Sequence, residues 1–185
     1  MVKPEPTHSN REKEMSDKTV GVVLAGCGFL DGAEIHEATL TLLALDQAGV
    51  TVRCLAPNIP QMHVVDHTAS SPVEGATRNV LTESARIARC EVEDVATVSA
   101  EDLDALIFPG GFGAAKNLCS FAVDGPACSI DESVASLIQG MYDAEKPQGF
   151  ICIAPTLAAK VLGKTGVKLT IGTDERTAAG IEALG

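Results

Sequence analysis

The sequence predicts a doubly wound α/β fold, in which a mostly parallel sheet is covered by helices on both faces. From Thr19 onward, short apolar runs rich in β-branched residues alternate with segments of helical periodicity. Small aliphatic side chains dominate a composition that is 45% hydrophobic, as expected for a sheet buried on both faces. At 185 residues, we expect a single domain over residues 19–185, preceded by a polar, disordered tail over residues 1–18.

The predicted strands are the short apolar runs. Glycine and proline close them, for example at Pro57 and at Pro109-Gly110-Gly111. Residues 58–75 contain two prolines and a short valine pair, so we expect this segment to leave the sheet as an excursion. The strands are expected over residues 20–25, 50–56, 106–108, 149–151 and 169–171.

The predicted helices follow from apolar side chains at helical spacing and from residues that cap helix ends. Asp31 and Glu34 form an acid-x-x-acid capping box before the first helix, and Asp131 and Asp174 cap two later ones. Pro155 stands at a helix start, where its missing N–H costs nothing. The helices are expected over residues 32–48, 77–89, 131–145, from 154 onward, and 174–184.

The charge balance excludes two classes of partner. The chain has 14 basic and 25 acidic residues and a formal charge of −11, so nucleic-acid backbones and anionic membranes would repel it. Apolar runs also fall short of the ~18 residues that a membrane span requires. We therefore expect neither nucleic acid nor membrane as a partner.

Cysteine spacing and the composition of the first residues predict a cytoplasmic location. The six cysteines include no C-x-x-C pair and no zinc spacing, which favours reduced thiols in a cytosol-like compartment. Residues 1–19 contain four acidic side chains, whereas an organelle presequence is rich in arginine and poor in acids.

Two glycine-rich loops resemble nucleotide-binding motifs without completing them. Gly26-Cys27-Gly28 is followed by Gly32, one residue late for a dinucleotide fingerprint, so a glycine turn is the simpler interpretation. The loop that starts at Gly110 lacks the ending of a phosphate-binding loop, so we expect Lys116 to cap or pair.

His63 and His67 lie near Asp66 but have no third ligand at metal spacing. We expect them to be solvated loop side chains, and we predict no metal site.

Cys152 lies where strand, corner and helix meet at the carboxyl edge of the predicted sheet. Ala154 supplies the small residue that a tight strand-to-helix turn requires, and Pro155 begins the helix. The positive end of that helix favours thiolate, so we expect the pKa of Cys152 to lie below the free value of ~8.5. A merely buried cysteine is the alternative that the sequence leaves open.

Backbone amides near this corner are candidates for an oxyanion hole. Gly110 and Gly111 end the preceding strand, and their N–H groups are expected to face the corner beside that of Ile153. The simpler alternative is that the glycines only close the strand. Cys27, just past the first strand, and His36, on the first helix, are auxiliary candidates; their simpler interpretations are a core or loop thiol and a surface or dimer-contact histidine.

Five stretches in matching order carry a resemblance to a known family. They are LAGCG (24–28), DGAEIHEA (31–38), PGGFGAAKNL (109–118), GFICIAP (149–155) and LTIGTD (169–174). Over everything after Thr19 the chain resembles the ElbB, or enhancing lycopene biosynthesis, family, a glyoxalase-like branch of the PfpI and class I glutamine amidotransferase-like superfamily. The resemblance implies a flavodoxin-like sandwich with a nucleophile elbow, and a homodimer. The family normally continues for a few tens of residues, so we expect truncation after Gly185.

The resemblance also implies roles for individual residues. Cys152 would be the nucleophile, Glu37 its carboxyl partner, and the Gly111 and Ile153 amides the oxyanion hole. Cys152 would add to glyoxal or methylglyoxal, a small aldehyde substrate, and yield a 2-hydroxy acid without metal or other cofactor. Because Ile153 stands where protease-like relatives have histidine, peptidase and amidotransferase activities are not expected.

The alternative is a protein that does not turn over a substrate. Cys152 would then be oxidised as a redox or stress sensor, or the chain would regulate the isoprenoid pathway.

Overall fold

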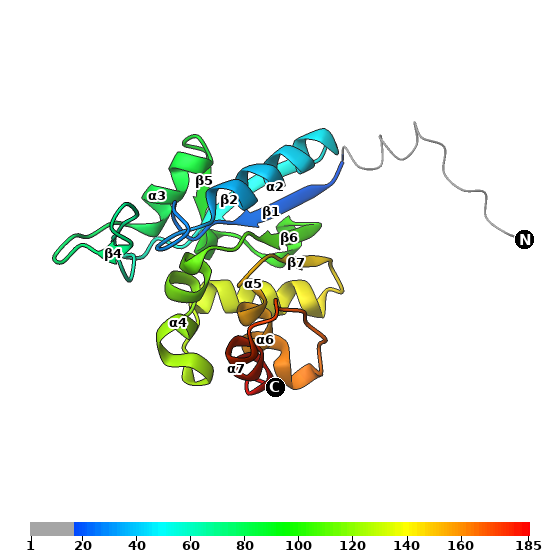
Figure 1. The fold of residues 1–185 in the computed structure, drawn as a ribbon. Coiled ribbons are helices and arrows are strands. Elements are labelled where there is room, and N and C mark those ends of the chain that lie inside the picture. The colour runs from blue at the N-terminus through cyan, green and yellow to red at the C-terminus, as the bar shows by residue number, and fades with distance from the viewer. Residues whose placement is uncertain (1–16) are drawn as a thin grey trace, which may run out of the picture.

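A parallel sheet organises the part of the chain that the structure describes, residues 17–185 of a computed structural model (Figure 1). Its spatial order is β5-β2-β1-β6-β7, and every neighbouring pair is parallel. The chain winds outward from β1 in both directions, so the predicted doubly wound fold is confirmed. The tail predicted over residues 1–18 lies outside the described residues except for its last two. The five strands are β1 (Thr19–Val23), β2 (Thr51–Ala56), β5 (Val92–Asp94), β6 (Ala105–Phe108) and β7 (Gln148–Phe150).

Helices cover both faces of the sheet (Figure 1). On β1, Val22 points toward α2 and α3, whereas Val23 points into the larger core under α5 and α6. The alternation of side chains along a strand therefore gives the molecule two apolar cores. The helices are α2 (Ile35–Gln47), α3 (Val80–Ile87), α4 (Phe121–Asp124), α5 (Glu132–Asp143), α6 (Pro155–Leu162) and α7 (Glu175–Glu182). Among residues 17–185, none of the helices has the length and apolar character to cross a membrane.

The excursion predicted over residues 58–75 contains a small hairpin outside the main sheet. Its strands β3 (Val65–Asp66) and β4 (Ser71–Pro72) pair antiparallel. This hairpin holds the loop after β1, as described below.

Capping residues behave as predicted at two helices and differently at the first. Asp131 accepts hydrogen bonds from the amides of Ser133 and Val134, and Asp174 caps α7. The first helix begins at Ile35, and its cap is Glu34, which accepts from the Glu37 amide at 2.7 Å. The capping role predicted for Asp31 is wrong, because its carboxylate is buried and accepts from the Val65 amide of the hairpin at 2.7 Å.

Two strand predictions fail for opposite reasons. Residues 169–171 have strand-like composition but form no strand, and Ile171 lines the cavity beside Cys152. Strand β5 was not predicted from the sequence, since two of its three residues are acidic. It forms because it pairs with β2, where Arg53 and Glu93 make two charged hydrogen bonds of 2.8 and 2.7 Å.

Candidate active site

Cys152 occupies a sharp turn between β7 and α6. Its φ of 58° lies in the left-handed region, which residues with a side chain adopt at a cost of order 1–3 kcal/mol. The turn is fixed by the Ala154 amide, which donates to the Ile151 carbonyl at 2.9 Å. Thr156 adds a hydroxyl hydrogen bond of 2.8 Å to the Ile153 carbonyl. The turn leaves Cys152 exposed at the carboxyl edge of the sheet.

Two backbone amides reach the sulfur of Cys152. The N–H groups of Gly111 and Ile153 both hydrogen-bond to it, one from the loop after β6 and one from the start of α6. Gly111 has φ 91°, and a Cβ there would collide with the backbone of residues 32–34. The structure therefore brings together the two amides named from the sequence, and it requires glycine at one of them.

Glu37 approaches Cys152 from the first turn of α2. Its Oε2 accepts a hydrogen bond of 2.8 Å from the Gly110 amide. The same carboxylate is also a hydrogen-bond partner of the Cys152 thiol. Gly110 lies between the two side chains. A Cβ at this position would overlap the Cβ of Cys152 and come within 2.5 Å of Glu37 Oε2.

Opposing influences set the pKa of Cys152, and the net effect raises it. Partial burial of the thiol raises the pKa most, and the charge and hydrogen bond of Glu37 raise it further. The Gly111 and Ile153 amides lower it, as the start of a helix was expected to do, but they do not prevail. The predicted low thiol pKa is therefore wrong, because burial and a neighbouring carboxylate outweigh the amides.

An apolar cavity of about 550 Å³ opens beside Cys152. Its apolar walls include four residues from four separate segments of the chain: Phe29, Phe112, Ile153 and Ile171. A second cavity, of about 580 Å³, shares Phe112 and Ile153 with the first. The thiol thus faces a space large enough for a small organic substrate.

The two auxiliary candidates lie apart from these contacts. His36 is exposed, and its Nδ1 lies 2.8 Å from Oε1 of Glu34. Burial raises the pKa of Cys27, as does the charge of Glu83, so this thiol lies toward α3. Within residues 17–185, no group of three or more His, Cys, Asp or Glu side chains is placed to hold a metal ion.

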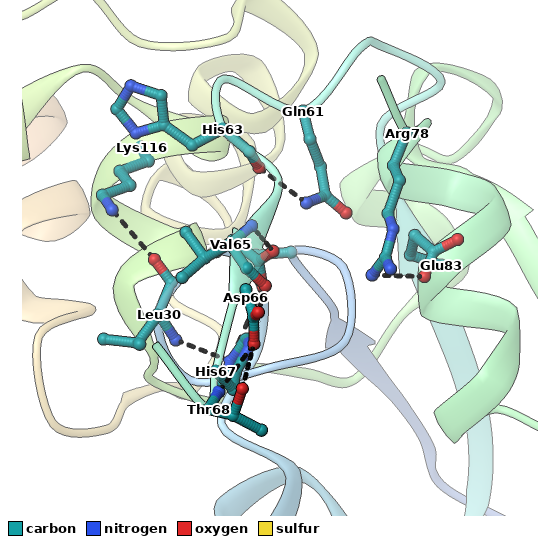
Figure 2. Close-up of polar contacts among 12 residues, drawn as sticks. Leu30, Gln61, His63, Val65, Asp66, His67, Thr68, Arg78, Glu83 and Lys116 are labelled. Carbon is teal, nitrogen blue, oxygen red and sulfur yellow. Dashed lines mark hydrogen bonds and ion pairs between the residues drawn. The ribbon is translucent and has the colours of Figure 1, made fainter. Parts of the chain in front are cut away.

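A polar network that was not predicted from the sequence holds the loop after β1 (Figure 2). His67 accepts from the Leu30 amide at 3.3 Å, and Lys116 donates to the Leu30 carbonyl at 2.9 Å. The His67 ring also packs edge-on against Phe29 of the cavity wall, with 5.4 Å between ring centroids. Lys116 thus bonds a loop carbonyl instead of capping a helix end, and His67, although exposed as expected, packs against the cavity wall. No local motif could reveal partners that lie 37 and 86 residues apart.

The fold defines the chain as a flavodoxin-like α/β domain of the class I glutamine amidotransferase and DJ-1 type. The solved structure of an isoprenoid biosynthesis protein with an amidotransferase-like domain, from Ehrlichia chaffeensis, matches with a TM-score of 0.75. It is 42% identical, and the match covers 79% of this chain and 69% of that one. A DJ-1 superfamily protein from Agrobacterium tumefaciens matches in fold alone, with 17% identity and a TM-score of 0.52 over 90% of this chain and 71% of that one.

Curated relatives agree with this class, although no family model matches the chain. The human glutamine amidotransferase-like class 1 domain-containing protein 3, mitochondrial, is 52% identical over 90% of this chain and 65% of its own length. The ES1 protein, mitochondrial, of Danio rerio is 38% identical over 84% of this chain and 59% of its own length. The chain therefore spans less than two thirds of these relatives. It belongs to the family of proteins with an amidotransferase-like domain.

The relatives correct the predicted location. The human and Danio rerio proteins and a Rattus norvegicus homologue, 49% identical over 90% of this chain and 65% of its own length, are all named as mitochondrial. The cytoplasmic prediction is wrong, and these names point to mitochondria. It rested on cysteine spacing and on the acidic residues near the start of the chain, and neither of these decides the compartment.

Proposed function

We propose that the chain is a cofactor-free glyoxalase of the ElbB type, which converts glyoxal or methylglyoxal to a 2-hydroxy acid. One observation carries the proposal: two backbone amides and the Glu37 carboxylate meet at the thiol of Cys152, which faces an apolar cavity. A nucleophile, a proton acceptor and an oxyanion site are what addition to a carbonyl requires.

The first step forms a bond between sulfur and the aldehyde carbon. Because the pKa of Cys152 is raised, the thiol needs a proton acceptor at neutral pH, and Glu37 is hydrogen-bonded to it. Glu37 takes the thiol proton as the sulfur adds, and the aldehyde oxygen becomes an alkoxide. The Gly111 and Ile153 amides would stabilise that oxyanion, and a proton then completes the hemithioacetal.

The second step moves hydrogen within the bound adduct. A base removes the proton from the former aldehyde carbon, and a proton returns to the neighbouring carbon, so the adduct becomes a thioester of the 2-hydroxy acid. Water then breaks the C–S bond, releases the acid and restores the thiol. The net reaction adds one water to the 2-oxoaldehyde and leaves the enzyme unchanged.

Turnover of methylglyoxal by the wild-type chain and by Cys152→Ala tests the proposal. We expect the wild type to form lactate and the variant to lose at least ~10²-fold in kcat/KM. Cys54→Ala, which removes a half-buried thiol of β2, is the matched control and should keep full activity. Equal turnover by Cys152→Ala and wild type would overturn the assignment.

A second candidate, a cysteine-based redox sensor, is favoured by the exposure of Cys152. The same two amides would stabilise the oxygen of a sulfenic or sulfinic acid. Hydrogen peroxide would then modify Cys152 rapidly, while methylglyoxal would not be consumed. The Ehrlichia chaffeensis name connects this family with isoprenoid biosynthesis, which fits a regulatory role but specifies no reaction.

A further inference from the structure

Two cysteines outside the candidate active site lie at the two ends of one short segment. Cys119 follows the helical turn Ala114–Leu118, and Cys128 follows the 3-10 turn Gly125–Ala127. Both are free and buried, with exposed fractions of 4% and 2%. The segment between them contains α4.

Backbone pairing brings the two ends of this segment together. Cys119 forms an antiparallel bridge with Ile130, and the Ser120 amide donates to the Ser129 carbonyl at 3.0 Å. Cys128 is two residues from Ile130, so its side chain projects from the same face as that of Cys119. Cys119 Sγ donates to the Ala114 carbonyl at 3.4 Å. Each of the two thiols also shifts the pKa of the other, as groups that are close in space do.

We propose that Cys119 and Cys128 are a dithiol pair that hydrogen peroxide oxidises to an intrachain disulfide. The inference is independent of the proposed function, because neither cysteine takes part in the aldehyde chemistry. One sulfur attacks a peroxide oxygen: an S–O bond forms, the O–O bond breaks, and the leaving hydroxide becomes water. The second sulfur then displaces the sulfenic oxygen as another water. In total, the two thiols give up two electrons and two hydrogens, and peroxide is reduced to two waters.

The surroundings decide which sulfur reacts first. Burial raises the pKa of Cys119 to about 11. Burial also raises the pKa of Cys128, but the positive charge of Lys160 opposes this. Cys128 therefore ionises more readily and forms the sulfenic acid, which Cys119 resolves.

A cavity adjoins the segment that carries the pair. Gly125 and Pro126, just before Cys128, and Phe121, just after Cys119, line the cavity of about 580 Å³. Because this cavity shares Ile153 with the cavity beside Cys152, the disulfide would fix a wall that adjoins the candidate active site. Exposed Cys152 will react faster, so the disulfide should form as a second, slower event.

Peptide mapping of the peroxide-treated full chain tests the proposal. Remaining thiols are blocked with iodoacetamide, and the chain is cut without reduction by a protease that cleaves before aspartate. Asp124 lies between the two cysteines, so residues 104–123 and 124–130 become separate peptides. We expect the two peptides to be found joined, with a mass two hydrogens below the sum of the separate peptides. They should separate on reduction. The oxidised chain should also melt several degrees higher, since the bond closes a loop of the chain.

Matched variants assign the bond. Cys119→Ser and Cys128→Ser should each abolish the joined peptide, whereas Cys54→Ser should leave it unchanged. The wild-type map decides the question even if a variant fails to fold. Oxidation of Cys152 alone, a disulfide to any other cysteine, or Cys128 driven to sulfinic acid while Cys119 stays reduced would each overturn the proposal.

Discussion

Cys152 combines a strained backbone with a thiol whose pKa is raised. A φ of 58° is stabilised by the turn around it, and the sulfur lies between two N–H donors and one carboxylate. Donors favour thiolate, whereas the carboxylate and burial favour the thiol. The balance makes Glu37 the residue that decides when the proton leaves.

Glu37→Gln should therefore make Cys152 more acidic and the protein less active. The substitution removes the negative charge and the carboxylate acceptor that raise the pKa of Cys152, so that pKa falls. The pH midpoint of alkylation by iodoacetamide should shift to lower pH, while methylglyoxal turnover falls by about 10²-fold or more, because the proton carrier is lost.

Glu132→Gln is the matched control, since Glu132 is also an acid in the first turn of a helix but is exposed on α5. It should change neither the midpoint nor the turnover. An unchanged midpoint in Glu37→Gln would show that Glu37 does not act on the thiol.

Gly110→Ala should disable the site by steric overlap alone. The added methyl group would collide with the Cβ of Cys152 and crowd Glu37, so we expect a loss of about 1–3 kcal/mol in the free energy of unfolding and a loss of turnover. Gly149→Ala, in the adjoining strand, would meet its nearest neighbour, Ile107, at an ordinary 3.6 Å and should be close to neutral. Urea unfolding and methylglyoxal turnover of both variants check this, and equal effects at the two glycines would contradict it.

The first turn of α2 carries Glu37, so the cap of this helix bears on the candidate active site. Glu34 caps the helix by accepting from the amide of Glu37, the residue whose side chain contacts Gly110 and Cys152. The pKa of Glu34 is lowered, since hydrogen bonds from His36 and from the Glu37 amide together overcome burial, which alone would raise it. A charged cap therefore holds the first turn, and with it Glu37, in place.

Removing this cap should affect activity, whereas removing an equivalent cap elsewhere should not. Glu34→Ala and Asp131→Ala each delete a carboxylate that accepts from first-turn amides, so each should lower the free energy of unfolding by about 1 kcal/mol. Glu34→Ala should also reduce methylglyoxal turnover, because the turn that carries Glu37 frays. If Asp131→Ala lost as much turnover, general destabilisation rather than the position of α2 would be the cause.

Periodicity and capping patterns predicted most of the elements because those signals are local. Asp131 and Asp174 cap the helices that the sequence assigned to them. Residues 169–171 and β5 were mispredicted because a strand exists only where a partner strand is available. β5 has two acids in three residues, yet it pairs with β2 at the edge of the sheet.

The arrangement of the whole molecule explains why the site forms at this edge. Parallel strands direct their carboxyl ends to one edge of the sheet. β1 and β6 are neighbours, but the chain passes from β1 to β2 on one side and from β6 to β7 on the other. Loops after β1, β6 and β7 therefore meet there and bring Phe29, Gly111 and Cys152 to one cavity.

The backbone amides of the site could be predicted because a glycine pair and a strand-to-helix corner are visible in sequence. Glu37 required a family resemblance, since its position on the helix does not single it out. The support that His67 gives to Phe29 could not be predicted, because it joins a hairpin to a distant loop.

The cavity is larger than glyoxal needs, and its walls predict a preference among 2-oxoaldehydes. Phe112, which is 45% exposed, offers an aromatic face at the mouth beside Cys152. Burying a phenyl ring there is worth roughly 1.5–3 kcal/mol, so kcat/KM for phenylglyoxal should exceed that for glyoxal by about 10-fold or more. Phe112→Ala should remove most of this advantage and leave glyoxal turnover nearly unchanged, since glyoxal has no ring to bury.

Tyr142→Ala removes a comparably exposed aromatic side chain from α5 and should keep the preference. Steady-state kinetics of the three proteins with both aldehydes measure the ratio, and a ratio that stays the same in Phe112→Ala would show that this wall does not bind the substrate.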